Sequence, residues 1–137
     1  MGFFRDDLRD LALFAQASRS ELAVIRRHLT PLHVPAGRVL VQEGTRGDQF
    51  MIIAQGRATV RQGGHTIATL GPGDLVGEMA LLDPEGLGRR NATVTTTTDA
   101  VVYAGSRSEF RQILDTAPSV ARMVRETAAA RTMAIAA

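Results

Sequence analysis

The sequence predicts a mainly β domain, an antiparallel sandwich or barrel-like roll, with helices at its N-terminal and C-terminal ends. Strand-forming segments recur at about ten-residue spacing across residues 32–104, and glycine-containing turns separate them. Residues 1–30 and 106–137 show helical periodicity instead. No helix of crossover length lies between the predicted strands, which disfavours a parallel α/β fold. With 137 residues, the chain is expected to form a single domain, 1–137.

The N-terminal block, 1–30, contains a clear helix start. Ser18 and Glu21 have the spacing of a capping box, in which each side chain accepts a hydrogen bond from the other residue's backbone N–H. Apolar side chains then recur three and four residues apart, at Leu22, Ile25 and Leu29. We also expect a shorter helix around residues 8–15. Pro31 is expected to end the block.

The middle block, 32–104, contains the predicted strands. They span residues 38–42, 49–54, 58–61, 66–70, 91–97 and 101–103. Their turns contain glycine, often beside aspartate or proline, as tight turns require.

The C-terminal block, 106–137, opens with a second capping box, formed by Ser106 and Glu109. Pro118 is expected to begin the last helix, because the first turn does not need its missing N–H. Mostly small residues then form a narrow seam, Val120, Met123, Thr127, Ala130, Ala134 and Ala137. This seam either packs on its own domain or forms a homodimer contact with a second copy.

Composition excludes several functional classes. The chain has no cysteine, so disulfides, thiolate metal sites and a cysteine nucleophile are excluded. All 16 basic residues are arginines, but they are scattered among 14 acidic residues and the net charge is only +2, so we expect no direct DNA binding. The chain contains no long apolar run and begins with a charged segment where a signal peptide would be apolar. We therefore expect a cytoplasmic protein that makes no membrane contact.

One stretch, residues 73–94, departs from the strand pattern. Residues 78–82 could form little more than one helical turn. The free backbone N–H groups at the start of such a turn would attract an anion. Gly77 would allow a ligand to approach the backbone closely. Arg90 could hold a phosphate through two parallel hydrogen bonds, and Glu78 could accept a hydrogen bond from a neighbouring hydroxyl. A ribose phosphate is a ligand that offers both groups, an anion and a neighbouring hydroxyl.

These residues resemble the phosphate-binding cassette of the cyclic nucleotide-binding domain family. Residues 77–82 read Gly-Glu-Met-Ala-Leu-Leu, and residues 90–94 read Arg-Asn-Ala-Thr-Val. The upstream segment 42–56 is similar to the family's glycine-rich hairpin. The resemblance implies an antiparallel β-roll, of the double-stranded β-helix or jelly-roll kind, over residues 32–104, with the cassette at 77–94.

The resemblance also implies a ligand and a role for each residue. The family binds cAMP or cGMP without changing it, so no catalytic residue, metal or enzymatic activity is expected. Arg90 would hold the cyclic phosphate, Glu78 would accept the ribose 2′-hydroxyl, and the last helix, 118–137, would act as a lid. The candidate ligand-binding residues are Gly77, Glu78, Met79, Ala80, Arg90, Asn91 and Ala92.

Three alternatives remain open in the sequence. Asn91 follows the arginine where relatives often have Ala, Ser or Thr, which leaves the choice between cAMP and cGMP undecided. The long loop 83–88 is also consistent with a β-roll that has lost its ligand and serves as an interaction or dimerisation module. A metal-dependent cupin-like enzyme is disfavoured, because the three histidines lack ligand spacing. The sequence does not identify the protein effector that would read the signal.

Overall fold

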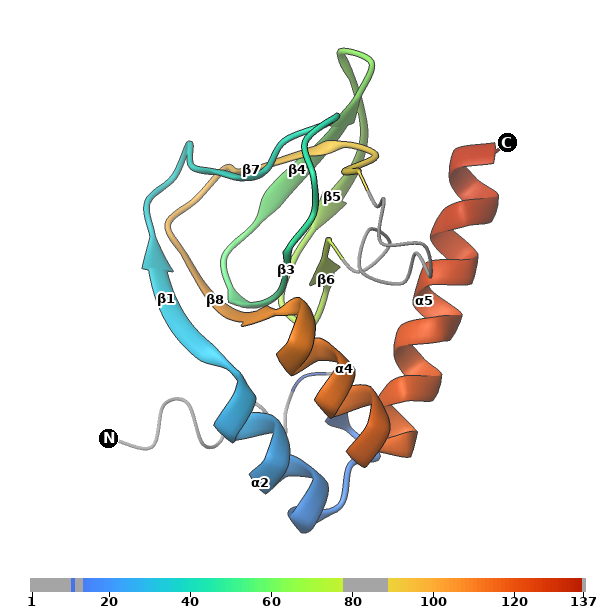
Figure 1. Ribbon diagram of the computed structural model, residues 1–137. Helices are drawn as coiled ribbons and strands as arrows, with labels where there is room; N and C mark the ends of the chain where they lie inside the picture. Colours follow the sequence, from blue (N-terminus) through green and yellow to red (C-terminus); the bar gives the residue numbers. More distant parts are fainter. Residues whose placement is uncertain (1–10, 12–13, 78–88, 137) are drawn as a thin grey trace.

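The protein folds into two four-stranded antiparallel sheets that form a roll (Figure 1). The computed structural model describes residue 11, residues 14–77 and residues 89–136. One sheet has the order β1 (Thr30–Val34), β8 (Ala100–Ser106), β3 (Gln49–Gln55) and β6 (Leu75–Val76). The other has the order β2 (Val39–Val41), β7 (Thr93–Thr96), β4 (Ala58–Gln62) and β5 (His65–Leu70). The predicted antiparallel architecture is confirmed.

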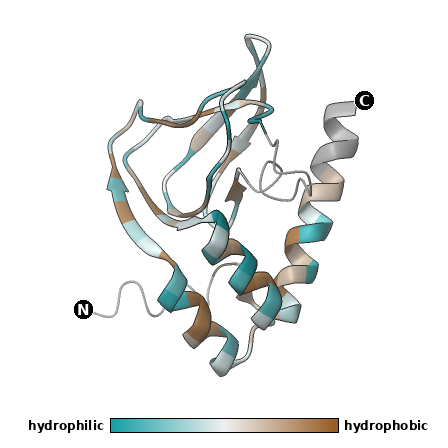
Figure 2. Ribbon diagram, viewed as in Figure 1, coloured by the Kyte–Doolittle hydropathy of each residue, from teal (hydrophilic) through white to brown (hydrophobic). Residues whose placement is uncertain are grey.

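In the part of the chain that the structure describes, three helices flank the roll: α2 (Arg19–His28), α4 (Arg107–Thr116) and α5 (Pro118–Ala136). Helix α4 contacts both α2 and α5, and it lies between them in Figure 1. Apolar and polar bands alternate along α2 and α4, as amphipathic packing requires (Figure 2). Within the described ranges, none of the helices combines the length and the hydropathy needed to span a bilayer.

Both predicted capping boxes are present. In the first, the Ser18 N–H donates to Glu21 Oε1 at 2.8 Å and the Glu21 N–H donates to Ser18 Oγ at 3.1 Å. In the second, the corresponding distances between Ser106 and Glu109 are 2.9 and 3.1 Å. Pro118 begins the last helix, as predicted.

The core has two apolar layers that share β3 and β8. Along β3, Phe50 and Ile52 face the helices, whereas Met51 and Ile53 face the other sheet. Strand β8 alternates in the same way, because successive side chains of a strand point to opposite faces. Burial on both faces explains why these strands read as nearly continuous apolar runs.

Four sequence-based expectations require correction. Pro31 does not end a helical block but lies inside β1, so the strands begin before residue 32. Strand β8 runs from Ala100 to Ser106, so it is longer than the predicted strand 101–103 and passes the predicted end of the β block at residue 104. The two-residue strand β6 was not predicted. Strand β7 begins at Thr93, so Arg90 and Asn91 precede it. The short helix expected around residues 8–15 falls largely outside the described residues.

The first half of α5 packs on its own domain. Val120 and Val124 are buried in the core beneath the helices, and Met123 is partly buried there. Thr127 is half-buried, whereas Ala130 is exposed. The buried face therefore follows Val120, Val124 and Ala128 rather than the whole predicted seam. Intramolecular packing accounts for the seam up to Thr127, and a homodimer contact through this helix remains a prediction.

Candidate functional site

The site is organised around the backbone of Arg90, which a glycine-containing turn holds in place. The Arg90 N–H donates to the Thr45 carbonyl at 2.7 Å, and the Gly44 N–H donates to the Arg90 carbonyl at 2.9 Å. Gly44 has φ +84°, a left-handed conformation that glycine adopts without steric cost. The two segments singled out in the sequence, the glycine-rich hairpin and the cassette, are thus joined directly by hydrogen bonds.

The Arg90 side chain points inward and is only 8% exposed. Its Nη1 donates to the Gly77 carbonyl at 2.9 Å, and its Nη2 donates to the Gln49 carbonyl at 2.6 Å. Among the side chains that the structure describes, Arg90 and Thr96 are the buried polar ones, and Arg90 alone carries a charge. Burial of a charge costs free energy, so a charged side chain in this position requires an explanation.

The two carbonyls give the Arg90 guanidinium a fixed direction. A guanidinium is a planar fork whose N–H groups match the geometry of a phosphate. These two hydrogen bonds, to the carbonyls of Gly77 and Gln49, orient the fork. The arrangement is suited to an anion that can approach Arg90 near Gly77.

Gly77 is required in its place on two grounds. Its φ of +86° lies in the left-handed region that side chains disfavour. A Cβ built there would overlap Nη1 of Arg90 and lie 3.1 Å from the Gln49 carbonyl oxygen. The glycine therefore makes room for the guanidinium, in addition to turning the chain at the end of β6.

The other predicted site residues divide into two groups. Asn91 is exposed, and its carbonyl accepts a hydrogen bond from Gln62 Nε2 at 3.1 Å, while Ala92 is half-buried. Both follow Arg90 on the approach to β7. The remaining three predicted residues, Glu78, Met79 and Ala80, lie outside the described residues. The structure therefore brings Gly77, Arg90, Asn91 and Ala92 to one region.

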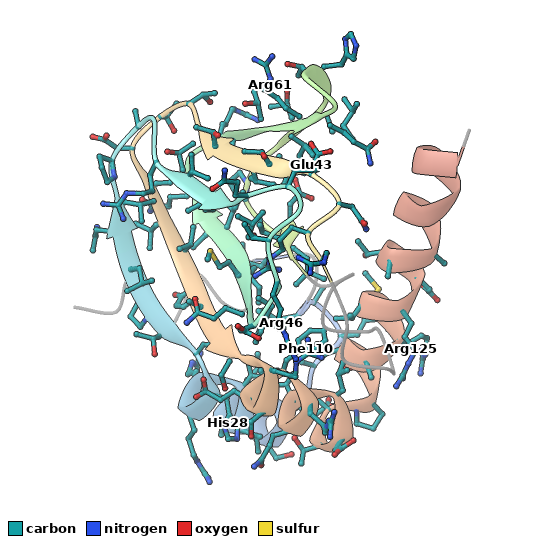
Figure 3. The ribbon with its side chains drawn as sticks, turned by 45° about the horizontal axis from the view of Figure 1, so that its top comes forward. His28, Glu43, Arg46, Arg61, Phe110 and Arg125 are labelled. Carbon is teal, nitrogen blue, oxygen red and sulfur yellow. The ribbon has the colours of Figure 1, made fainter. Side chains whose placement is uncertain are left out.

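Arg89, the neighbour of Arg90, points away from Gly77 and Gln49 and lies outside the site. It is exposed, and its Nη1 donates to the Gly44 carbonyl at 2.9 Å. Its backbone pairs with that of Arg46 in an isolated antiparallel bridge. Figure 3 labels Arg46. In the same view, Glu43 and Arg61 lie towards one end of the roll, and Phe110 and His28 lie towards the other.

Sequence reasoning missed two parts of the site that act through their backbone. Gln49 contributes its carbonyl to Arg90 as the first residue of β3, and Thr45 contributes its carbonyl from the preceding turn. Neither contribution depends on the side chain, so the residue types at 45 and 49 give no signal. The nearby glycines at 44 and 47 provided the only hint.

The described part of the chain contains no group of three His, Asp or Glu side chains that could hold a metal ion. The histidines that the cupin-like alternative would need lie on separate elements: His28 ends α2, His33 is in β1 and His65 begins β5.

Comparison with known proteins identifies similar chains among both curated proteins and solved structures. A cyclic nucleotide-gated potassium channel of Rhizobium etli is 36% identical over 121 residues, which cover 87% of this chain and 32% of the channel. The catabolite activator protein of Thermus thermophilus superposes with a TM-score of 0.77 at 28% identity, covering 88% of this chain and 58% of that one. The chain thus spans about a third of the channel's length.

A further solved structure supports the fold alone, since its sequence identity is only 22%. It is described as Sp-2Cl-cAMPS bound to PKAR CBD2, with a TM-score of 0.82 over 95% of this chain and 85% of that one. The family model of the cyclic nucleotide-binding domain matches residues 31–117, which include both segments of the site and β1 to α4. This chain belongs to the cyclic nucleotide-binding domain family.

Proposed function

We propose that this chain binds a cyclic nucleotide, cAMP or cGMP, and acts as a regulatory sensor domain. The observation that carries the proposal is the buried, inward-directed guanidinium of Arg90 between the carbonyls of Gly77 and Gln49. Arg90 would bind the cyclic phosphate through charge-assisted hydrogen bonds. Family membership supplies the ligand class.

The remaining contacts follow from the family resemblance. Glu78 would accept a hydrogen bond from the ribose 2′-hydroxyl, and backbone amides near Gly77 and Ala80 would bind phosphate oxygens. Met79, Asn91 and Ala92 would complete the pocket. The chain would bind the nucleotide without changing it, because these residues position an anion and a hydroxyl and need no reacting group.

The regulatory part of the proposal concerns α5. Val120 and Val124 anchor its first half in the core, so its later turns are the part that could close over the ligand. Ligand binding would order the cassette, 77–94, and dock this helix. Such a response requires ligand contacts that differ between the two states of the helix. A protein effector would then read the position of α5.

Thermal unfolding of the full chain with cAMP, cGMP and 5′-AMP tests the proposal. A ligand at a hundredfold excess over its Kd should raise the free energy of unfolding by about 2.7 kcal/mol. We expect stabilisation by at least one cyclic nucleotide and a much smaller effect of 5′-AMP, whose phosphate is not closed onto the ribose. The larger of the two cyclic-nucleotide shifts identifies the preferred ligand.

The absence of any shift with either cyclic nucleotide at millimolar concentration would contradict the proposal. The chain would then be a β-roll that has kept the fold without the ligand, and an interaction or dimerisation module would become the better account. Sedimentation of the unliganded chain would then test for a second copy.

A further inference from the structure

Arg46 and Arg89 lie opposite each other on two neighbouring extended segments. Their backbones form an isolated antiparallel bridge, and both side chains are exposed. Residues opposite each other in an antiparallel pair have Cβ atoms about 4.5–5.5 Å apart, and their side chains lie on the same face. Like charges in this arrangement repel each other and destabilise the pair. Two arginines in these positions therefore require an explanation.

The charge of Arg89 is held close to the turn that supports Arg90. Its Nη1 donates to the Gly44 carbonyl at 2.9 Å, and the Gly44 N–H donates to the Arg90 carbonyl, also at 2.9 Å. The acceptor of the Arg89 side chain is a neutral oxygen, so this hydrogen bond positions the guanidinium and leaves its positive charge in place. The exposed charge next to the site is thus a fixed feature of the fold.

Two more arginines donate to the same short segment, residues 44–49. Arg90 and Arg107 each donate from Nη2 to a backbone carbonyl of this segment, at 2.6 and 3.0 Å respectively. Four arginines therefore lie in the segment or donate to it, whereas the segment itself contains one acidic residue, Asp48. The candidate ligand-binding arginine is thus surrounded by further positive charge.

This gathering of arginines is local, because the chain as a whole is nearly balanced. Its 16 basic and 14 acidic residues give a net charge of only +2. Glu43, the acidic residue just before the segment, accepts a hydrogen bond at Oε1 from the Gly63 N–H at 3.1 Å, which directs its carboxylate to the turn between β4 and β5. Charges of one sign gathered at a site raise the local concentration of ligands of the opposite sign.

Arg46 and Arg89 are close enough to Arg90 to act on a ligand that approaches it. Arg89 precedes Arg90 directly, and successive Cα atoms are about 3.8 Å apart. Arg46 lies three residues before Gln49, whose carbonyl binds the Arg90 guanidinium, so at most about 10 Å of chain separates them. This length equals the Debye length at about 0.1 M salt, so the two charges act at low ionic strength and are screened at high ionic strength.

We infer that Arg46 and Arg89 steer the anionic nucleotide towards Arg90 without contacting it in the bound state. The inference rests on the proposed function, in which the ligand carries a negative charge on its cyclic phosphate. Steering of this kind raises the association rate constant, kon, and leaves the dissociation rate constant, koff, unchanged. Two neighbouring charges attract an anion more strongly than one, which accounts for the repulsive pair.

The test measures kon and koff by stopped-flow fluorescence on the full chain. The probe is the cyclic nucleotide that stabilises the chain, labelled with a fluorophore on C8 of its base. In the double variant Arg46→Gln/Arg89→Gln, we expect kon to fall about fivefold at about 0.05 M salt and koff to stay within about twofold. At about 0.5 M salt, kon should be the same with and without the substitutions.

Two further double variants separate local charge from other effects. Arg46→Lys/Arg89→Lys keeps both charges and should keep the unmodified kon. Arg19→Gln/Arg38→Gln removes the same two charges from exposed positions, one at the start of α2 and one hydrogen-bonded to Thr96 at the far end of β7 from Arg90, and kon should stay within about twofold. If the Arg46→Gln/Arg89→Gln double variant does not fold, the two single variants should each show part of the loss.

The outcomes distinguish the inference from the function on which it rests. An unchanged kon in Arg46→Gln/Arg89→Gln, or a change confined to koff, would overturn the inference and leave the proposed function standing. Equal losses in Arg19→Gln/Arg38→Gln would show that only the net charge matters, and a loss in the lysine variant would point to hydrogen-bond geometry; either result contradicts steering by this pair. If the unmodified chain binds neither cyclic nucleotide, both the inference and the proposed function fail.

Discussion

The guanidinium of Arg90 occupies the space that a side chain at Gly77 would need. Nη1 of Arg90 lies 2.9 Å from the Gly77 carbonyl, and a Cβ on Gly77 would overlap that nitrogen. The glycine at the end of β6 and the arginine before β7 therefore depend on each other, although 13 residues separate them. The absence of a side chain at residue 77 decides where the positive charge can lie.

Gly77→Ala should destabilise the protein more than the same change at a glycine with equal backbone strain. Gly37 is the matched control, with φ +84° against +86° and no atom within 4 Å of an added Cβ. Strain alone should cost about 1–2 kcal/mol at either position. Displacement of Arg90 adds to this only at Gly77. Urea unfolding measures the difference, and equal losses in the two variants would show that Arg90 moves aside freely.

Ser106→Ala should destabilise the protein by about 1 kcal/mol, because it removes the N-cap of α4. The Glu109 N–H would lose its acceptor, Ser106 Oγ, now at 3.1 Å. Ser108→Ala changes the same residue type at an exposed position inside the helix and should have little effect. Chemical denaturation checks both variants, and a loss in Ser108→Ala as large as that in Ser106→Ala would argue against the capping role.

Glu21 should make stability depend on acidity. The hydrogen bond from the Ser18 backbone N–H is the main cause that lowers the pKa of Glu21, and Ser119 adds to it, while burial opposes the shift. A lowered pKa in the folded state means that the unfolded chain takes up the proton more readily. The stabilisation is therefore complete above the unfolded-state pKa and is lost as the pH falls through the folded-state pKa.

Glu21→Gln tests this linkage while keeping a capping side chain. The loss of unfolding free energy between about pH 7 and about pH 3 should be smaller in Glu21→Gln than in the unmodified chain. Glu126→Gln, at an exposed position of α5, serves as the control. An unchanged pH dependence in Glu21→Gln would contradict the assignment.

Local features of the fold could be predicted because their partners are close in the sequence. Both capping boxes join residues three apart, and Pro118 marks a helix start by its own chemistry. Strand β1 was missed because its stabilising partner is distant: Pro31 pairs with Tyr103 of β8. As an edge strand it tolerates a proline, and it exposes its first four residues, so it has no alternating apolar pattern.

The site was predictable to a similar degree. The cassette pattern located Gly77 and Arg90, whose residue types carry the geometry. The carbonyls of Thr45 and Gln49 could not be found in this way, since any residue offers a carbonyl. The hydrogen bond from Arg107 Nη2 to the Gly47 carbonyl likewise joins residues 60 apart in sequence, which only folding brings together.

The most direct test of the account compares cyclic nucleotide binding to Arg90→Lys and Arg89→Lys by isothermal titration. The two arginines are adjacent and both substitutions preserve the charge, but only Arg90 is buried and points inward. Lysine cannot form the two parallel hydrogen bonds, so we expect Arg90→Lys to bind about a hundredfold more weakly, a loss of about 2.7 kcal/mol. Arg89→Lys should bind like the unmodified chain. Equal affinity in both variants would contradict the role assigned to Arg90.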